Sequence, residues 1–285
     1  MAERVTVYEV GPRDGLQNEA RIIPTAEKIA LVDMLSACGF TRIEAASFVS
    51  PKWVPQMADA AKVMAGIARA PGVSYAALTP NLRGFEAARA AGADEVAIFA
   101  AASETFSRRN INASIAESLE RFAPVAAAAA EAGIALRGYV SCVTDCPYEG
   151  EIAPAAVARV AERLFALGCR EVSLGDTIGR GTPARVVALL DAVLEVAPAA
   201  RLAGHFHDTG GRALENIEAA LGMGLRVFDA ACGGLGGCPF APGASGNVAS
   251  EAVVARLEAL GFATGIDAEK LGAAGVFARG LRAAA

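Results

Sequence analysis

The sequence predicts an α/β fold in which eight strands and eight helices alternate to form a closed (β/α)₈ barrel. Three observations support this prediction. Short apolar or β-branched segments alternate with helical stretches, eight such segments can be counted, and no long linker separates them. A barrel of this kind takes about 250 residues, so the 285-residue chain leaves room for a short C-terminal helical extension. We therefore expect residues 1–285 to form a single TIM-barrel catalytic domain.

The expected elements follow from local signals along the chain. Proline or threonine marks the starts of helices at Pro24-Thr25, Pro154 and Thr182-Pro183, because proline suits the first helical turn. A glycine ends a helical stretch shortly before several of the strands, as a left-handed helix cap does. These glycines are Gly39, Gly92, Gly133, Gly168 and Gly224. The strands are expected near residues 4–10, 41–47, 73–79, 95–101, 135–141, 170–176, 201–207 and 227–232.

An open, doubly wound sheet of similar length is the alternative fold. Such sheets bind dinucleotides through a G-x-G-x-x-G turn after the first strand. No such turn follows residues 4–10, so the closed barrel is favoured. In a closed barrel the chemistry lies at the C-terminal ends of the strands.

Composition and charge exclude several classes of partner. The net charge of −5 argues against nucleic acid and anionic membrane surfaces. No uncharged apolar run approaches the ~18 residues of a membrane span, and the first residues show no signal-peptide pattern. None of the six cysteines forms a C-x-x-C pair, which is typical of free thiols in a reducing compartment. We expect a cytoplasmic protein, and the sequence leaves open whether it forms a homo-oligomer.

The only two histidines, His205 and His207, lie in the strand expected at residues 201–207. Residues i and i+2 of a strand point to the same side, so both imidazoles can face the barrel mouth while Phe206 faces the helices. A lone histidine is most often a core residue. Two histidines in H-x-H at the end of a barrel strand favour a metal site instead.

Asp14 and Asn247 are the expected partners of the histidines. Asp14 follows the first strand and Asn247 follows the eighth, and both strands lie close to the seventh in a closed barrel. Two imidazoles, a carboxylate and an amide oxygen form a fairly hard ligand set that suits Mg²⁺ or Mn²⁺. A helix-cap role for Asp14 and a turn role for Asn247 are the alternatives.

Arg13 precedes Asp14 directly. Adjacent side chains diverge on a strand or a tight turn, so Arg13 can meet a substrate while Asp14 holds the metal. A fixed cation there can stabilise an enolate oxygen or hold a carboxylate. A surface ion pair is the alternative role.

A glycine-rich segment, Gly233–Gly243, follows the eighth strand and contains Cys238. It has no Lys-Ser/Thr pair, so it is not a P-loop. We interpret it as a lid that delivers the thiol to a closed site, with a passive connecting loop as the alternative.

Two carboxylates, Glu44 and Asp176, end the second and sixth strands. At the barrel mouth either could tune a proton transfer or position a water. Structural salt bridges or helix caps are the alternatives. Cys142 and Cys146 lack further ligands at a recognised spacing, and we expect them to be structural.

At these residues the chain resembles the 3-hydroxy-3-methylglutaryl-CoA lyases, which are related to the isopropylmalate and homocitrate synthases. The similarity runs over nearly the whole chain. Arg-Asp-Gly and H-x-H are shared across the wider group, whereas the Gly-Leu-Gly-Gly-Cys-Pro loop is much more specific to the lyases. The matching segments are Gly11–Glu19, Ser173–Gly179, His205–Thr209 and Gly233–Asn247.

The resemblance implies a reaction and a set of roles. The reaction is retro-Claisen cleavage of the CoA thioester to acetyl-CoA and acetoacetate, and with it a place in leucine degradation and ketone-body formation. A divalent metal, Mg²⁺ or Mn²⁺, is implied as the cofactor. The implied metal ligands are Asp14, His205, His207 and Asn247. Arg13 is implied on the substrate and Cys238 as the reactive thiol, with Glu44, Asp176 and His205 as further catalytic residues. The base for the substrate hydroxyl stays open among His205, Asp176 and a water.

The chain departs from the family pattern around the histidines. Relatives usually read His-Cys-His-Asp-Thr-Tyr-Gly-Gln, whereas this chain has Phe206, Gly210 and Arg212. The departure leaves open a related substrate, such as citramalyl-CoA or another 3-hydroxy-3-carboxyalkyl-CoA. A condensing synthase or aldolase on the same barrel is a second alternative, which the Cys238 loop disfavours. A non-catalytic binding barrel is a third, which the intact ligand set disfavours.

Overall fold

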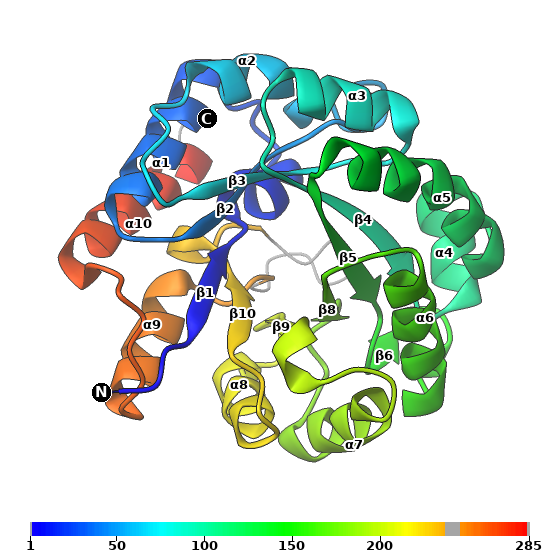
Figure 1. Ribbon diagram of the computed structural model, residues 1–285. Helices are drawn as coiled ribbons and strands as arrows, with labels where there is room; N and C mark the ends of the chain where they lie inside the picture. The colour runs from blue at the N-terminus through cyan, green and yellow to red at the C-terminus, as the bar shows by residue number, and fades with distance from the viewer. Residues whose placement is uncertain (1, 237–245, 284–285) are drawn as a thin grey trace.

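The computed structural model describes residues 2–236 and 246–283. Its main sheet is a closed barrel of eight strands in the order β1-β10-β9-β8-β5-β4-β3-β2, and every pair in it is parallel. Helices surround the barrel on the outside (Figure 1). The closed parallel barrel confirms the predicted fold and rules out the open doubly wound sheet.

All eight predicted strands are present in the barrel. The observed strands begin and end within a few residues of the expected limits, because apolar and β-branched runs between turn signals define strands locally. They are β1 (Thr6–Glu9), β2 (Arg42–Ser47), β3 (Ser74–Leu78), β4 (Glu95–Ala101), β5 (Ala135–Ser141), β8 (Glu171–Asp176), β9 (Leu202–Phe206) and β10 (Val227–Ala230).

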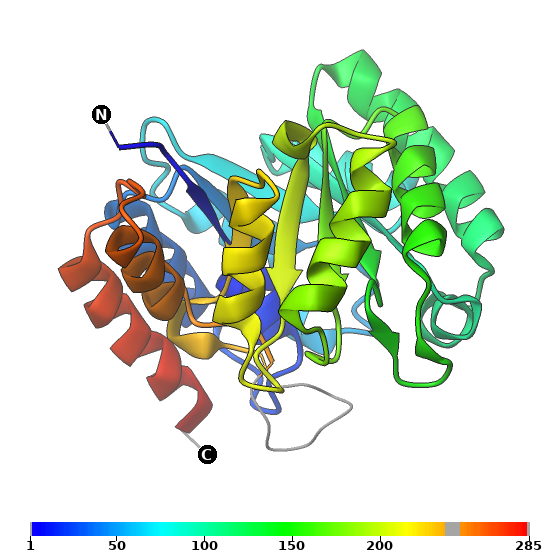
Figure 2. The ribbon, with the colours of Figure 1, turned by 90° about the horizontal axis from the view of Figure 1, so that it is seen from below.

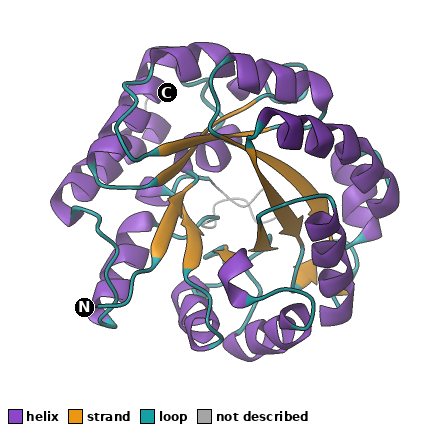
Figure 3. Ribbon diagram, viewed as in Figure 1, coloured by secondary structure: helices purple, strands orange, loops and turns teal. Residues whose placement is uncertain are grey.

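The helices follow the predicted starts and ends (Figure 3). Thr182 caps α7 by accepting from the backbone N–H of Arg185, and Pro154 and Pro183 occupy first turns as expected. All five predicted glycine caps have positive φ. The helices are α1 (Thr25–Ala37), α2 (Ala60–Gly66), α3 (Leu82–Ala90), α4 (Glu104–Ile111), α5 (Ile115–Ala132), α6 (Pro154–Ala166), α7 (Pro183–Leu194), α8 (Ala213–Gly222), α9 (Ser250–Ala259) and α10 (Ala268–Ala283).

Several short elements were not predicted. A two-stranded hairpin, β6 (Asp145–Cys146) and β7 (Gly150–Glu151), lies between β5 and α6. Short helical turns occur at η1 (Gly11–Gly15), η2 (Pro55–Met57), η3 (Ala199–Arg201) and η4 (Cys232–Gly234). Elements of two to five residues lack a periodic sequence pattern, so sequence reasoning does not detect them.

The C-terminal helix α10 forms the predicted extension. It lies on the outside of the barrel, beside α1 and α9 (Figure 2). Arg279 of α10 pairs with Glu251 of α9 at 3.1 Å, and Arg282 pairs with Glu19 at 2.9 Å. Among the described residues, no helix is long and apolar enough to cross a bilayer.

A charged layer fills part of the barrel interior. Arg137 of β5 has no exposed surface and forms a two-point ion pair with Asp229 of β10, with its Nη2 2.7 Å from Asp229 Oδ1. Arg137 also contacts Glu171 at 2.7 Å, and Arg42 joins Glu171 to Glu95. Interiors of such barrels are usually filled by branched apolar side chains. Here buried charges are tolerated because each carboxylate faces a guanidinium.

The Arg137–Asp229 pair generates a prediction about stability. Replacing Arg137 with Met leaves the buried carboxylate of Asp229 without its guanidinium, and losing one partner of a buried pair typically costs about 3–5 kcal/mol. We therefore expect a large fall in the free energy of unfolding, measured by urea titration.

Arg108→Met is the matched control. Arg108 pairs with Glu104 at 3.9 Å on the surface, with 64% and 52% of the two side chains exposed. Exposed pairs contribute little, so this variant should stay close to wild type. Equal losses for the two variants would show that the buried pair has no special role.

Candidate metal and acyl-substrate site

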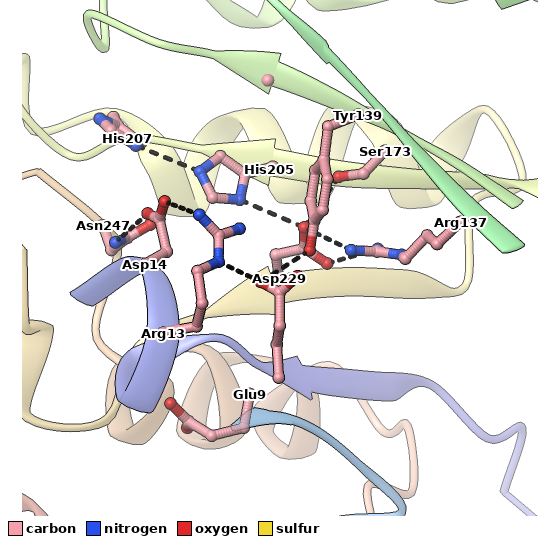
Figure 4. A network of polar contacts seen from close by, with 12 residues as sticks. Glu9, Arg13, Asp14, Arg137, Tyr139, Ser173, His205, His207, Asp229 and Asn247 are labelled. Carbon is pink, nitrogen blue, oxygen red and sulfur yellow. Dashed lines mark hydrogen bonds and ion pairs between the residues drawn. The ribbon is translucent and has the colours of Figure 1, made fainter. Parts of the chain in front are cut away.

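The two histidines face each other inside the barrel mouth. His205 lies in β9 and His207 follows it directly, and their Nε2 atoms are 3.1 Å apart (Figure 4). Phe206, between them, is 3% exposed and packs in the main hydrophobic core. The strand periodicity therefore places both imidazoles on one side, as predicted.

Asp14 and Asn247 complete the cluster. One ligand atom from each of Asp14, His205 and His207 lies within 4.8 Å of the other two. Asn247 donates from Nδ2 to Asp14 Oδ2 at 2.8 Å, and its backbone forms a bridge with that of His207. The four predicted ligands thus come together from β9, from η1 after β1, and from the segment after β10.

The donor set fits a divalent cation. Asp229 lies 3.2 Å from Nδ1 of His205, an arrangement that assigns the Nδ1 proton to this hydrogen bond and turns the Nε2 lone pair toward His207. Burial lowers the pKa of His207 to about 4, so its imidazole is neutral. Burial opposes the ionisation of Asp14, but the neighbouring guanidinium of Arg13, helped by the hydrogen bond from Asn247, outweighs it and lowers the pKa of Asp14 to about 2. Burial lowers the pKa of His205, but Asp229 outweighs it and raises that pKa, so a cation would compete with a proton for the Nε2 of His205. With that proton absent, two nitrogen lone pairs and an ionised carboxylate converge, with an amide whose oxygen is available if its side chain rotates.

Asp229 is a site residue that sequence reasoning missed. It accepts hydrogen bonds from His205, from Arg137 and, at 2.8 Å, from the hydroxyl of Ser173. Burial raises the pKa of Asp229, but Arg137 and His205 outweigh this effect and lower it. A carboxylate behind a metal-ligating histidine fixes its tautomer and orientation. The available signal was an acidic residue inside the short apolar strand Val227–Ala230.

Arg13 is buried beside Asp14 and Glu44. Its Nε donates to Glu44 Oε2 at 2.6 Å, and its Nη1 donates to Asp14 Oδ1 at 2.7 Å. The expected divergence of Arg13 and Asp14 is wrong, because η1 is a helical turn in which the long arginine side chain folds back to its neighbour. The surface ion pair is also wrong, since Arg13 is only 6% exposed. Glu44 and the ring of Tyr139, 5.4 Å away, hold the guanidinium at the mouth.

Asp176 is held by its own loop. Its carboxylate accepts from the hydroxyl of Thr144 at 2.8 Å and from the backbone N–H groups of Arg180 and Gly181. Burial raises its pKa. The helix-cap alternative is wrong, because Thr182 caps α7 and Asp176 holds the loop before it. None of these contacts joins Asp176 to Asp14 or the histidines.

Three cysteines were also singled out from the sequence. Cys238 lies outside the residues that the structure describes. Cys142 and Cys146 are buried, and the Sγ of Cys146 lies 3.0 Å from the Ser103 hydroxyl. Burial raises the pKa of Cys142, which fits the structural role expected for it.

Comparisons with known proteins agree over most of the chain. The hydroxymethylglutaryl-CoA lyase of Gallus gallus, a mitochondrial protein, is 60% identical over 275 residues, which cover 96% of this chain and 92% of that protein. The crystal structure of the HMG-CoA lyase from Brucella melitensis is 64% identical with a TM-score of 0.98, covering 99% of this chain and 100% of that one. The HMG-CoA lyase of Acinetobacter baumannii, in complex with coenzyme A and 3-methylmalate, is 40% identical with a TM-score of 0.93, covering 98% of this chain and 92% of that one.

The resemblance noted in the sequence is confirmed by these relatives. A family model described as HMGL-like matches residues 4–277, which is nearly the whole chain. The chain therefore belongs to the HMGL-like family.

Proposed function

We propose that this protein is a metal-dependent carbon–carbon lyase that cleaves 3-hydroxy-3-methylglutaryl-CoA to acetyl-CoA and acetoacetate. The observation on which the proposal rests is the cluster of Asp14, His205, His207 and Asn247 at the barrel mouth, beside the buried guanidinium of Arg13. Relatives at 56–60% identity are named as this enzyme. An acyl-CoA partner is supported by the relative whose structure contains coenzyme A.

The proposed cofactor is Mg²⁺ or Mn²⁺, held by the four residues of the cluster. A carboxylate, an amide oxygen and two imidazoles leave coordination positions free, which suits these hard cations better than a closed zinc site. When bound there, the ion would polarise the tertiary hydroxyl and a carboxylate oxygen of the substrate and lower the pKa of that hydroxyl.

Arg13 is proposed to balance the charge that develops during cleavage. Loss of the hydroxyl proton lets the C–C bond break, so the C3 oxygen becomes the ketone of acetoacetate and the bonding pair becomes the acetyl-CoA enolate. A donor that is already fixed costs no reorganisation when charge develops. Glu44 and Asp14 fix this guanidinium from two sides.

The geometry narrows the choice of base for the hydroxyl proton. Both nitrogens of His205 are committed, Nδ1 to Asp229 and Nε2 to the metal cluster. Asp176 has no exposed surface, and this burial raises its pKa. Its Oδ1 accepts from the hydroxyl of Thr144 and its Oδ2 from the backbone N–H of Gly181. We therefore propose that a water or Asp176, rather than His205, takes this proton.

Cys238 is proposed to return a proton to the enolate carbon, which completes acetyl-CoA. The proposal rests on the sequence of the loop alone, since this residue lies outside the described part of the chain. Substrate range, pathway and compartment stay predictions as well. Curated relatives bear both mitochondrial and cytoplasmic names.

The turn after His207 carries the two residues, Gly210 and Arg212, for which a related substrate was considered. Gly210 and Arg212 are both exposed, as expected if they do not shape the pocket. A Cβ at Gly210 would lie 2.6 Å from the carbonyl oxygen of Gly179, so a tyrosine there would force the backbone to shift. Gly210→Tyr is therefore a poor probe, and Arg212→Ala is the better one.

The first prediction for this function concerns substrate range. We expect purified protein with Mg²⁺ or Mn²⁺ to convert hydroxymethylglutaryl-CoA to acetyl-CoA and acetoacetate, identified by product analysis. The panel should include citramalyl-CoA and other 3-hydroxy-3-carboxyalkyl-CoA thioesters, because a pocket discriminates by only ~1–3 kcal/mol per methylene. A preference for another thioester that Arg212→Ala removes would favour the related substrate. Release of free CoA from acetyl-CoA and an oxo acid would indicate a condensing synthase.

The second prediction concerns the metal. Chelation should abolish cleavage, and Mg²⁺ or Mn²⁺ should restore it. His207→Ala should weaken Mn²⁺ binding and lower kcat by at least about 10-fold, since changing even a residue that only orients a ligand typically costs about 10–100-fold. Thr209→Ser, two residues along the same turn, is a control for general disturbance. Full metal content and activity in His207→Ala would show that the ligand assignment is wrong.

The third prediction concerns the loop thiol. Cys238→Ala should lower kcat by about 10²–10⁴-fold, the usual contribution of a general acid or base. Its Mn²⁺ affinity should stay unchanged, because the thiol is not among the ligands. Cys169→Ala, which removes a buried thiol far from the mouth, is the matched control. An unchanged kcat for Cys238→Ala would remove the thiol from the mechanism.

A further inference from the structure

Glu9 is a buried carboxylate that the mechanism does not use. It ends β1, has no exposed surface, and forms no ion pair with any described Lys, Arg or His. Most of the other buried carboxylates face a guanidinium, as Asp229 faces Arg137. A carboxylate buried without a cation is costly unless hydrogen bonds satisfy it. The hydrogen-bond partners of Glu9 therefore indicate its role.

Three hydrogen bonds satisfy Glu9, and each comes from a different segment. Oε1 accepts from the backbone N–H of Gly11 at 2.8 Å and of Cys232 at 2.9 Å. Oε2 accepts from the hydroxyl of Ser250 at 2.6 Å. One side chain of β1 therefore joins the start of η1, the segment after β10 and the start of α9.

Each partner stands at one end of a segment that carries a site residue. Gly11 opens the turn η1, which contains Arg13 and Asp14. Cys232 opens η4, from which the chain continues toward Cys238. Ser250 begins α9, three residues after Asn247. In Figure 4 Glu9 lies on the far side of η1 from the histidines, beneath Arg13.

These segments pack so closely that a movement at their base also moves Asp14 and Asn247. A Cβ on Gly11 would lie 2.6 Å from Glu9 Oε1, so the glycine makes room for the carboxylate. A Cβ on Gly15 would lie 2.6 Å from Leu235 Cβ, and one on Gly236 would lie 2.9 Å from Asn247 Nδ2. The turn with Asp14 and the segment with Asn247 thus touch, and a shift at their base moves both.

We propose that Glu9 is a positioning residue whose carboxylate anchors the bases of the segments that present Arg13, Asp14 and Asn247. The proposal rests on the function proposed above and adds a residue that touches neither metal nor substrate. Its effect is on geometry: without the anchor, η1 and the segment after β10 can separate, and the ligand atoms of Asp14 and Asn247 move apart.

The anchor does not depend on the charge of Glu9. Burial raises the pKa of Glu9 to about 7 despite its three hydrogen bonds, and the nearby Glu251 raises it further. The titratable groups around it are Glu251, Cys38 and Cys232. The hydroxyl of Ser250 can donate to the carboxylate or accept from the protonated carboxyl, so all three bonds survive titration. A neutral isostere should therefore replace Glu9.

The test compares Glu9→Ala with Glu9→Gln. In Glu9→Gln the amide oxygen accepts from Gly11 and Cys232, while the amide nitrogen donates to Ser250. We expect this variant to keep kcat and Mn²⁺ affinity within about twofold of wild type between pH 6 and 8.5, because its three hydrogen bonds remain. In Glu9→Ala we expect Mn²⁺ affinity, measured by electron paramagnetic resonance, and kcat each to fall by about 10-fold or more.

Two further variants separate positioning from general loss of stability. Tyr75→Phe removes a buried hydroxyl that bonds to Ser36 and to the N–H of Ala70, near the start of β3 and away from the mouth. It should lower the melting temperature without changing Mn²⁺ affinity. Ser250→Ala should weaken Mn²⁺ binding less than Glu9→Ala does, and adding it to Glu9→Ala should have no further effect, because both act on one anchor.

Specific outcomes would overturn the proposal. Glu9→Ala with wild-type Mn²⁺ affinity and kcat would show that the residue is structural only, and Glu9→Gln as impaired as Glu9→Ala would show that charge matters. If Glu9→Ala does not fold, wild-type Mn²⁺ affinity in Ser250→Ala decides against the anchor. A wild-type protein that binds Mn²⁺ but cleaves none of the thioesters would refute the proposed function and leave the Mn²⁺ comparison intact.

Discussion

The carboxylate of Asp229 links the interior of the barrel to its site. It accepts from the buried guanidinium of Arg137 on one side and from Nδ1 of His205 on the other. A carboxylate in this position is stable only because Arg137 compensates its charge, and the guanidinium is tolerated only because carboxylates surround it. The orientation of His205, and with it the direction of the Nε2 lone pair, depends on this buried pair.

The closed barrel makes the rest of the site possible. β9, β10 and β1 are neighbours around the barrel, so His205, the segment with Asn247 and the turn with Asp14 meet at one edge of the mouth. The next strand, β2, supplies Glu44, which holds Arg13. Glu9 lies under the same edge and joins the chain segments that leave it. The proposed metal ligands, Arg13 and the proposed anchor therefore lie on neighbouring strands or on the segments that directly follow them.

Much of the fold and of the ligand set could be predicted, and the failures have local causes. The H-x-H pattern correctly placed His205 and His207 on one side, because strand periodicity is a local property. The expected divergence of Arg13 and Asp14 failed, because a five-residue helical turn leaves no periodic signal. Asp176 was placed at a strand end correctly. Its hydrogen bonds to Thr144 and to its own loop depend on the β5–β6 connection, which the sequence pattern does not reveal.

The sequence by itself determined the eight strands, the helix starts and ends, and the residue types that could hold a hard cation. These features follow from short-range rules of alternation, capping and ligand chemistry. Only the tertiary structure decided that Asp229 stands behind His205, that Arg13 is buried between Glu44 and Asp14, and that Glu9 joins three segments. Such contacts link residues as far apart as Glu9 and Ser250. They form because closure of the barrel brings together strand ends that are far apart in the sequence. A local sequence pattern does not predict which of these residues will meet.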